Sequence, residues 1–154
     1  MSTTPTIHLN FTIQQGATFA PSWKRSQVPA EVVVRSGVLV HKSTGKPVTD
    51  AEKQPVDYTG CTARMQVRSD VQAPEVLLTF STEPQEGEGR ITLGSDGAVA
   101  LHLSPAQTAA LPYGDGAGQW RDGVGQMEIT FTNGDVFRHF EIHLCLDPEG
   151  TRGG

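Results

Sequence analysis

Apolar and polar residues alternate along the first segment of the chain. Residues 7–13 read IHLNFTI, with an apolar side chain at every odd position and a polar one between. A period of two places these two sets on opposite faces of an extended strand, so a half-buried β-strand is predicted here. The alternation ends at QQG (residues 14–16), where the glycine permits the backbone of a corner or a bulge.

The same alternation returns several times farther along the chain. It is found in residues 61–68 (CTARMQVR), 76–81 (VLLTFS), 91–93 and 99–103, and the last two runs flank the turn GSDG at 94–97. Roughly eight to ten short strands are predicted, without the alternation of strands and long helices that marks parallel sheets. The pattern therefore predicts an all-β fold, either an antiparallel β-sandwich or a partly open barrel.

A hairpin is predicted near the C-terminus, over residues 127–144 (MEITFTNGDVFRHFEIHL). Asn-Gly at 133–134 is typical of a two-residue hairpin turn, which would pair Thr132 with Asp135 and Met127 with Phe140. This register places the apolar residues of both strands on one face. Arg138 is the exception, because it falls opposite Ile129 on the apolar side and would have to reach an edge or meet a partner.

One short helix is predicted over residues 105–111. Ser104 suits the N-cap, Pro105 suits the first helical position, and Pro112 would stop the helix. Two segments are expected to lie outside the core strands. Residues 28–56 contain two valine-rich runs around Ser-Gly at 36–37 and then a polar stretch, which predicts an inserted hairpin plus loop. Residues 112–125 are predicted to be a Gly-rich loop.

Composition narrows the classes of protein. The chain has 154 residues with 17 Gly and 10 Pro, as expected of many turns, and is long enough for a single domain spanning 1–154 with its own core. A net charge of −5 argues against nucleic-acid binding. No apolar run is long enough for a membrane span, no secretory signal is visible, and two cysteines make no disulfide framework. We expect synthesis and folding in a cytoplasm, with no membrane partner.

The residues offer little support for a catalytic, cofactor or metal site. The sequence has five histidines, of which His139 and His143 lie on one polar strand face but about 13 Å apart, too far for one ion. The predicted register places His139 opposite Glu128 as an ordinary surface pair. Metal binding would need His8, His41, His102 or Cys145 to converge on one of the first two. No Walker loop, EF-hand or nucleophile-elbow motif is present.

Two groups of residues are candidates for contact with a partner. Arg64, Gln66 and Arg68 form a polar stripe on one predicted strand, which is either a solvated face or a surface that grips another protein. Tyr113 and Trp120 lie in the Gly-rich loop and are the aromatic residues best placed to stack on a sugar.

Several phrases occur in an order that resembles a known protein family. They are NFTIQQGATF, PVDYTGCTARMQVRSD, LLTFST, ITLGSDGAVALHLSPAQTAAL and MEITFTNGDVFRHFEIHL. Together they resemble small accessory proteins of the tail and baseplate regions of tailed bacteriophages and prophages. Two departures are the inserted residues 28–54 and the Gly-rich stretch before the final hairpin. The resemblance implies an immunoglobulin-like β-sandwich that is a virion component, without activity or cofactor.

The resemblance and the candidate contact residues together leave three functional hypotheses. The first is a non-enzymatic structural protein of the virion, in the tail, baseplate or head-to-tail region, that attaches fibres or spikes to the tail body. Its partners would be other phage proteins, such as those of the tail tube, nozzle, baseplate, fibre or spike, in multiple symmetric copies. The second is a capsid decoration or cement protein, and the third is a host-glycan-binding module that uses Tyr113 and Trp120.

Overall fold

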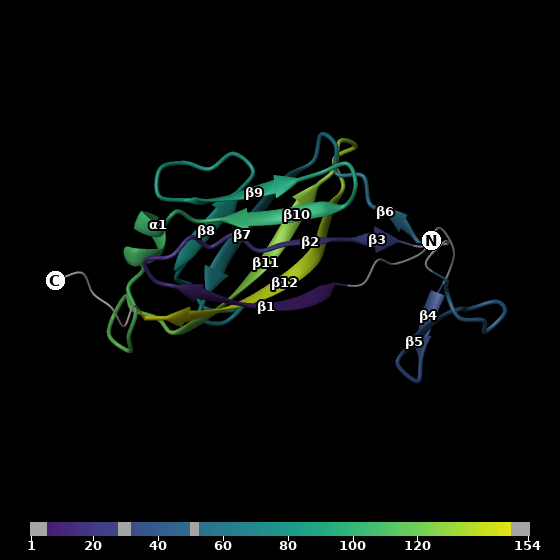
Figure 1. Ribbon diagram of the computed structural model, residues 1–154, viewed down its shortest axis with the longest axis horizontal. Coiled ribbons are helices and arrows are strands. Elements are labelled where there is room, and N and C mark those ends of the chain that lie inside the picture. Colours follow the sequence, from purple (N-terminus) through teal and green to yellow (C-terminus); the bar gives the residue numbers. More distant parts are fainter. Residues whose placement is uncertain (1–5, 28–31, 50–52, 149–154) are drawn as a thin grey trace.

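The computed structural model describes residues 6–27, 32–49 and 53–148, and their regular secondary structure is almost entirely β-strand (Figure 1). One eight-stranded sheet has the order β1-β12-β11-β7-β8-β9-β10-β2. Two small sheets pair β3 with β6 and β4 with β5. The strands are β1 (Ile7–Gln14), β2 (Ser22–Lys24), β3 (Ser26–Gln27), β4 (Val32–Arg35), β5 (Val38–His41), β6 (Gln54–Pro55), β7 (Thr62–Arg68), β8 (Leu78–Ser81), β9 (Gly89–Leu93), β10 (Ala98–His102), β11 (Asp122–Thr130) and β12 (Val136–Asp147).

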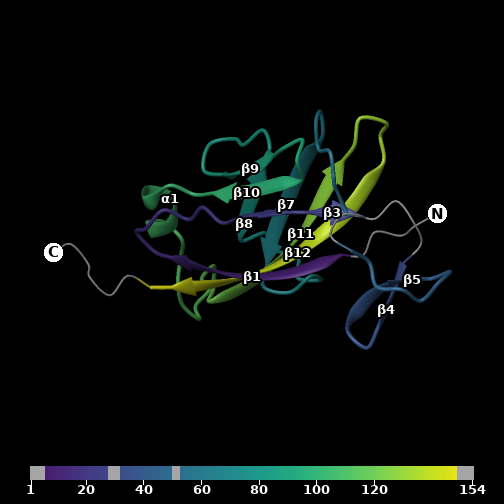
Figure 2. The ribbon, with the colours of Figure 1, turned by 45° about the vertical axis from the view of Figure 1, so that its right-hand side comes forward.

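The large sheet curls so that its two ends face each other (Figures 1 and 2). Trp23 on β2, at one edge, stacks on Phe11 of β1, at the other edge, with ring centroids 5.5 Å apart. Trp23 also meets the ring of Phe140 on β12 at 5.3 Å. The inward side chains of both halves form one apolar core, in which Met65, Phe80 and Phe140 are fully buried. The prediction of an all-β, sandwich-like fold is confirmed.

Most pairings in the large sheet are antiparallel, but β1–β12 and β8–β9 are parallel. In the first of these, the N-terminal strand lies along the C-terminal strand, from Ile7 opposite Phe140 to Gln14 opposite Asp147. The period-two pattern predicted β1 correctly, but it carries no information about which strand becomes its neighbour or in which direction.

The QQG corner that follows β1 is held by the short helix α1 (Pro105–Ala109). The backbone N–H of Ala17 donates to the carbonyl of Gln14 (3.1 Å), and Gly16 has a φ of 83°. The Gln15 amide donates to the carbonyl of Leu111 (2.6 Å), and the N–H of Gly16 donates to the hydroxyl of the buried Thr108 (3.0 Å). The Gln15 side chain and the Gly16 N–H therefore fix a structural corner, which is one of the two conformations that the sequence predicts at residues 14–16.

The helix signals of the sequence are confirmed. Ser104 is the N-cap, its hydroxyl accepts the N–H of Gln107, and the Gln107 side chain accepts the N–H of Ser104, which completes a capping box. The helix ends at Ala109, two residues before the predicted end. Within the described residues, no helix has the length and hydropathy needed to span a membrane.

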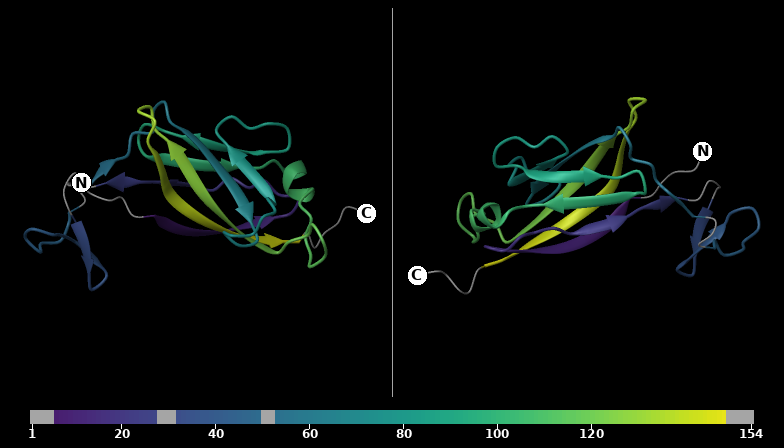
Figure 3. Two further views of the ribbon diagram at one scale, coloured as in Figure 1. Left: turned by 180° about the vertical axis from the view of Figure 1, so that it is seen from behind. Right: turned by 45° about the horizontal axis from the view of Figure 1, so that its top comes forward.

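The inserted hairpin stands away from the sheet, as the views from several sides agree (Figures 1 and 3). Strands β4 and β5 form a two-stranded sheet of their own, in which Arg35 lies opposite Val38, and Val40 of β5 also bridges to Pro47. The two residues between them, Ser36 and Gly37, have φ values of 52° and 77°, as a type I′ turn requires. The other small sheet pairs β3 with β6. The predicted hairpin is confirmed, while residues 28–31 and 50–52 of the predicted arm lie outside the described residues.

The C-terminal hairpin corrects the predicted register. The N–H of Phe131 donates to the carbonyl of Asp135 (2.8 Å), so the loop has three residues instead of two, and Thr130 lies opposite Val136. A β-bulge then restores the predicted pair of Met127 with Phe140. The two one-residue shifts cancel, and the extra residue on β12 is His139.

The Gly-rich loop is also shorter than predicted, since β11 already begins at Asp122. Gly123 and Gly125 lie inside this strand and are buried. A Cβ on Gly125 would come within 2.6 Å of Met65, and one on Gly123 within 2.7 Å of Val67. These glycines are strand residues that make room for core side chains, and sequence alone could not separate them from loop glycines.

Candidate functional site

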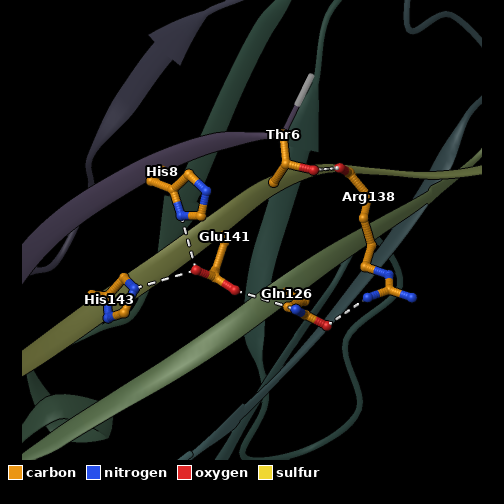
Figure 4. A network of polar contacts seen from close by, with 6 residues as sticks. All are labelled: Thr6, His8, Gln126, Arg138, Glu141 and His143. Carbon is orange, nitrogen blue, oxygen red and sulfur yellow. Dashed lines mark hydrogen bonds and ion pairs between the residues drawn. The ribbon is translucent and has the colours of Figure 1, made fainter. Parts of the chain in front are cut away.

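The outer face of the β1–β12 pair brings together two histidines and a glutamate that are far apart in sequence (Figure 4). The parallel register places His8 of β1 directly beside Glu141 of β12, and His143 lies two residues farther along the same face of β12. His8 Nδ1 is 2.9 Å and His143 Nε2 is 3.4 Å from the same oxygen, Glu141 Oε2. One ligand atom from each residue falls within a group whose members are all within 4.8 Å.

Neighbouring residues hold Glu141 in place (Figure 4). The Gln126 amide of β11 donates to Glu141 Oε1 (3.2 Å), and Arg138 Nη1 donates to the Gln126 oxygen (3.1 Å). The Thr6 hydroxyl, just before β1, donates to the Arg138 carbonyl (2.8 Å). These contacts leave Oε2 to the histidines and fix the carboxylate through its other oxygen.

The network also favours the charged form of Glu141. The hydrogen bond from Gln126, with smaller contributions from His143 and His8, lowers the pKa of Glu141 below its ordinary value. Two imidazoles and a carboxylate are ligands that divalent transition metals accept. The arrangement is thus the candidate metal centre of this protein.

Sequence reasoning missed this convergence. It placed His143 on a polar strand face correctly and considered His8 as a possible third ligand, but it tested the wrong partner, His139. The outward position of His8 and His143 was readable from the alternation of each strand. Their contact through Glu141 required the parallel pairing of β1 with β12, for which no local signal exists.

The prediction that His139 is a surface residue opposite Glu128 is wrong. Arg138 lies opposite Glu128, and it does not lie opposite Ile129 as predicted. The bulge turns the His139 ring inward, where only 4% of the residue is exposed. Its Nδ1 lies 3.0 Å from the Tyr58 hydroxyl, and Arg25 Nη1 donates to its backbone carbonyl (3.1 Å). Burial, and then the positive charge of Arg25, lowers the pKa of His139 to about 4. Burial raises the pKa of Tyr58 to about 12, so its hydroxyl stays protonated.

The predicted stripe on β7 lines a shallow cleft of about 300 Å³, next to the metal candidate. Arg64, Gln66 and Arg68 face Glu128 and Gln126 of β11 across it. Gln126 therefore lines this cleft and also holds Glu141 of the candidate metal centre. Arg68 is already engaged, because its guanidinium donates to the carbonyls of Ala73 (2.9 Å) and Pro74 (2.8 Å) and to the Gln66 oxygen (2.8 Å).

The two loop aromatics are not an exposed pair. Trp120 is 3% exposed and belongs to the core cluster, which corrects the expectation that it could stack on a sugar. Tyr113 is half-buried, and the Arg121 guanidinium covers its ring at 5.1 Å. Arg121 also pairs with Asp115, at 2.7 Å. The position of Trp120 among glycines favoured a surface loop, but the indole packs in the core, where a Cβ on Gly123 of β11 would come within 3.3 Å of its ring.

Both cysteines, Cys61 and Cys145, are free thiols, as expected of a chain without a disulfide framework. No protein-family model matches the chain, and no curated protein matches it.

Proposed function

We propose that this chain is a non-enzymatic structural protein of a tailed-bacteriophage virion, which attaches fibres or spikes to the tail body in the tail, baseplate or head-to-tail region. The proposal rests on the ordered resemblance of its segments to phage tail accessory proteins. The structural observation that best supports it is the projecting β4–β5 hairpin.

The hairpin has the features of a contact arm. It is internally ordered by its type I′ turn and by hydrogen bonds such as that from the Val48 N–H to the Leu39 carbonyl (2.9 Å). Near its tip it exposes two large apolar side chains, Val34 at 69% and Val38 at 48%. Valine prefers burial, and a projecting apolar tip is suited to insertion between neighbouring subunits.

The polar outer face offers a second contact surface. Arg64, Glu128 and Arg138 lie on neighbouring strands and are exposed, with both signs of charge present. Mixed charges on a rigid sheet fix the orientation and register of a partner more than they raise its affinity. A protein present in several symmetric copies would use both surfaces repeatedly.

The proposal is tested with particles released from the bacterium that carries this gene. Quantitative mass spectrometry should find the chain in purified particles, at tens of copies or fewer, and deletion should give particles that lack fibres or spikes in electron micrographs. Hundreds of copies per particle would instead indicate capsid decoration. Particles with complete tails that lack the chain would refute the proposal.

Variants then test the arm. The deletion is complemented with Val34→Asp, and with Val136→Asp as a matched control, since Val136 is a comparably exposed valine (53%) at another hairpin. Loss of incorporation with the first and normal incorporation with the second would support the arm as the contact surface. Equal incorporation of both variants would argue against it.

A further inference from the structure

We propose that His8, Glu141 and His143 form a binding site for one divalent late first-row transition-metal ion, with Zn²⁺ as the natural probe. This inference does not depend on the proposed virion function. It follows from the ligand types, their spacing and the support around them.

The spacing fits a tetrahedral ion. With bonds of about 2.1 Å, two ligand atoms of such a site stand about 3.4 Å apart. Glu141 Oε2 lies 3.4 Å from His143 Nε2 and 2.9 Å from His8 Nδ1, and the ligand atoms of all three residues fall within 4.8 Å of one another. Binding would require the ligand nitrogens of His8 and His143, which lie no more than 4.8 Å apart, to come to about 3.4 Å from each other, and both imidazoles are exposed.

The surroundings suit a site that fills from solution. The side chains of His8 and His143 are 64% and 51% exposed, so an ion can enter without any opening of the fold. Glu141 is only 18% exposed and is positioned by Gln126, which is itself held by Arg138. Residues that hydrogen-bond to a metal ligand, as Gln126 does to Glu141, orient the ligand and strengthen its binding to the ion.

The site would have a structural consequence. β1 is an edge strand of the large sheet, hydrogen-bonded to β12 alone among its strands. A bond from His8 to an ion shared with Glu141 and His143 would cross-link the two strands and close the loop between the ends of the chain. With three protein ligands, the fourth position would take water or a donor atom from a neighbouring molecule.

The test uses the purified full chain. Equilibrium dialysis with Zn²⁺ should give one ion per chain, and Co²⁺ should show the absorption of a tetrahedral site with nitrogen and oxygen ligands. Each of His8→Ala, Glu141→Gln and His143→Ala should weaken binding by more than about 100-fold, and Gln126→Ala by about 10-fold.

Two controls separate this site from others on the surface. His102→Ala removes an exposed histidine of β10, and Cys145→Ser removes the exposed thiol of β12; both should bind as the original chain does. Thermal unfolding adds a second readout, since Zn²⁺ should raise the Tm of the original chain but not that of Glu141→Gln.

A histidine NMR spectrum makes the test independent of variant folding. On addition of Zn²⁺, the imidazole signals of His8 and His143 should move while those of His102 and His139 stay in place. Absence of binding, unchanged affinity in the three ligand variants, or a thiolate absorption band with Co²⁺ would each overturn the proposal.

Discussion

The buried His139 predicts a specific loss of stability in acid. In the unfolded chain its imidazole takes up a proton near the ordinary pKa of 6.5, whereas in the folded chain burial and the charge of Arg25 lower the pKa to about 4. Between these values the unfolded state binds a proton that the folded state does not. The contribution of His139 is therefore fully present above about pH 6.5 and is lost as the pH falls toward 4.

The magnitude follows from the same interval. Each pH unit between the two pKa values corresponds to about 1.4 kcal/mol, so the free energy of unfolding should fall by up to about 3 kcal/mol across the window. This is a large part of the stability of a typical domain, which is about 5–15 kcal/mol. The group is 4% exposed, so solvent screening reduces the effect little.

Urea unfolding at several pH values from about 7 to about 4 measures this effect. The perturbation is His139→Asn, which keeps a polar acceptor near the Tyr58 hydroxyl but cannot take up a proton. The variant should be less stable at neutral pH and should have a shallower pH dependence. The difference in unfolding free energy between the original chain and the variant should shrink by up to about 3 kcal/mol.

The matched control is His102→Asn, which replaces an exposed histidine and should keep the steep pH dependence of the original chain. Contributions from Glu141 and the outer histidines are common to all three proteins, and they cancel in the comparison. If the difference between the original chain and His139→Asn stays constant from neutral to acid pH, the assignment of His139 as a buried neutral imidazole is wrong.

Three glycine substitutions test the backbone packing. Gly97→Ala should destabilise the fold by roughly 3 kcal/mol or more, because φ is +83° and a Cβ would lie 2.2 Å from the Arg25 carbonyl oxygen. The control Gly87→Ala, at a φ of +85° with open space around it, should cost only about 1–2 kcal/mol. Equal shifts in the Tm of the two variants would contradict the clash. Gly125→Ala should cost about 1–3 kcal/mol through its contact with Met65, and less in a Met65→Ala background, as a double-mutant cycle by denaturant unfolding would show. Additive costs would mean that Met65 is not the residue that excludes a side chain there.

Local chemistry explains which parts were predictable. The turn at Ser36-Gly37 and the N-cap at Ser104 each depend on a few consecutive residues, and both are present as predicted. The structure adds that the turn is of type I′ and that Gln107 completes a capping box. The same holds for the alternation in β7, where Ala63, Met65 and Val67 are buried. In each case the residues whose pattern predicts the element are also the residues that form its turn, its cap or its buried face.

The candidate site was only partly predictable, because it depends on contacts between residues that are far apart in the sequence. The outward position of His143 comes from the period of its own strand, but its approach to His8 through Glu141 depends on a parallel pairing between the two ends of the chain. Likewise, Asn133-Gly134 indicated a hairpin correctly, yet the loop took one more residue. The bulge at His139 then restored the alignment of Met127 with Phe140.

By itself, the sequence determined most of the strands, their two-sided character, the short helix and the turn at Ser36-Gly37, since these follow from steric and hydrogen-bonding preferences between near neighbours. The tertiary structure alone decided which strands became neighbours and which polar residues were buried. Such choices depend on the packing of the whole core: the inward bulge puts His139 beside Tyr58 and Arg25, and the pairing of β1 with β12 gathers the outer histidines around Glu141.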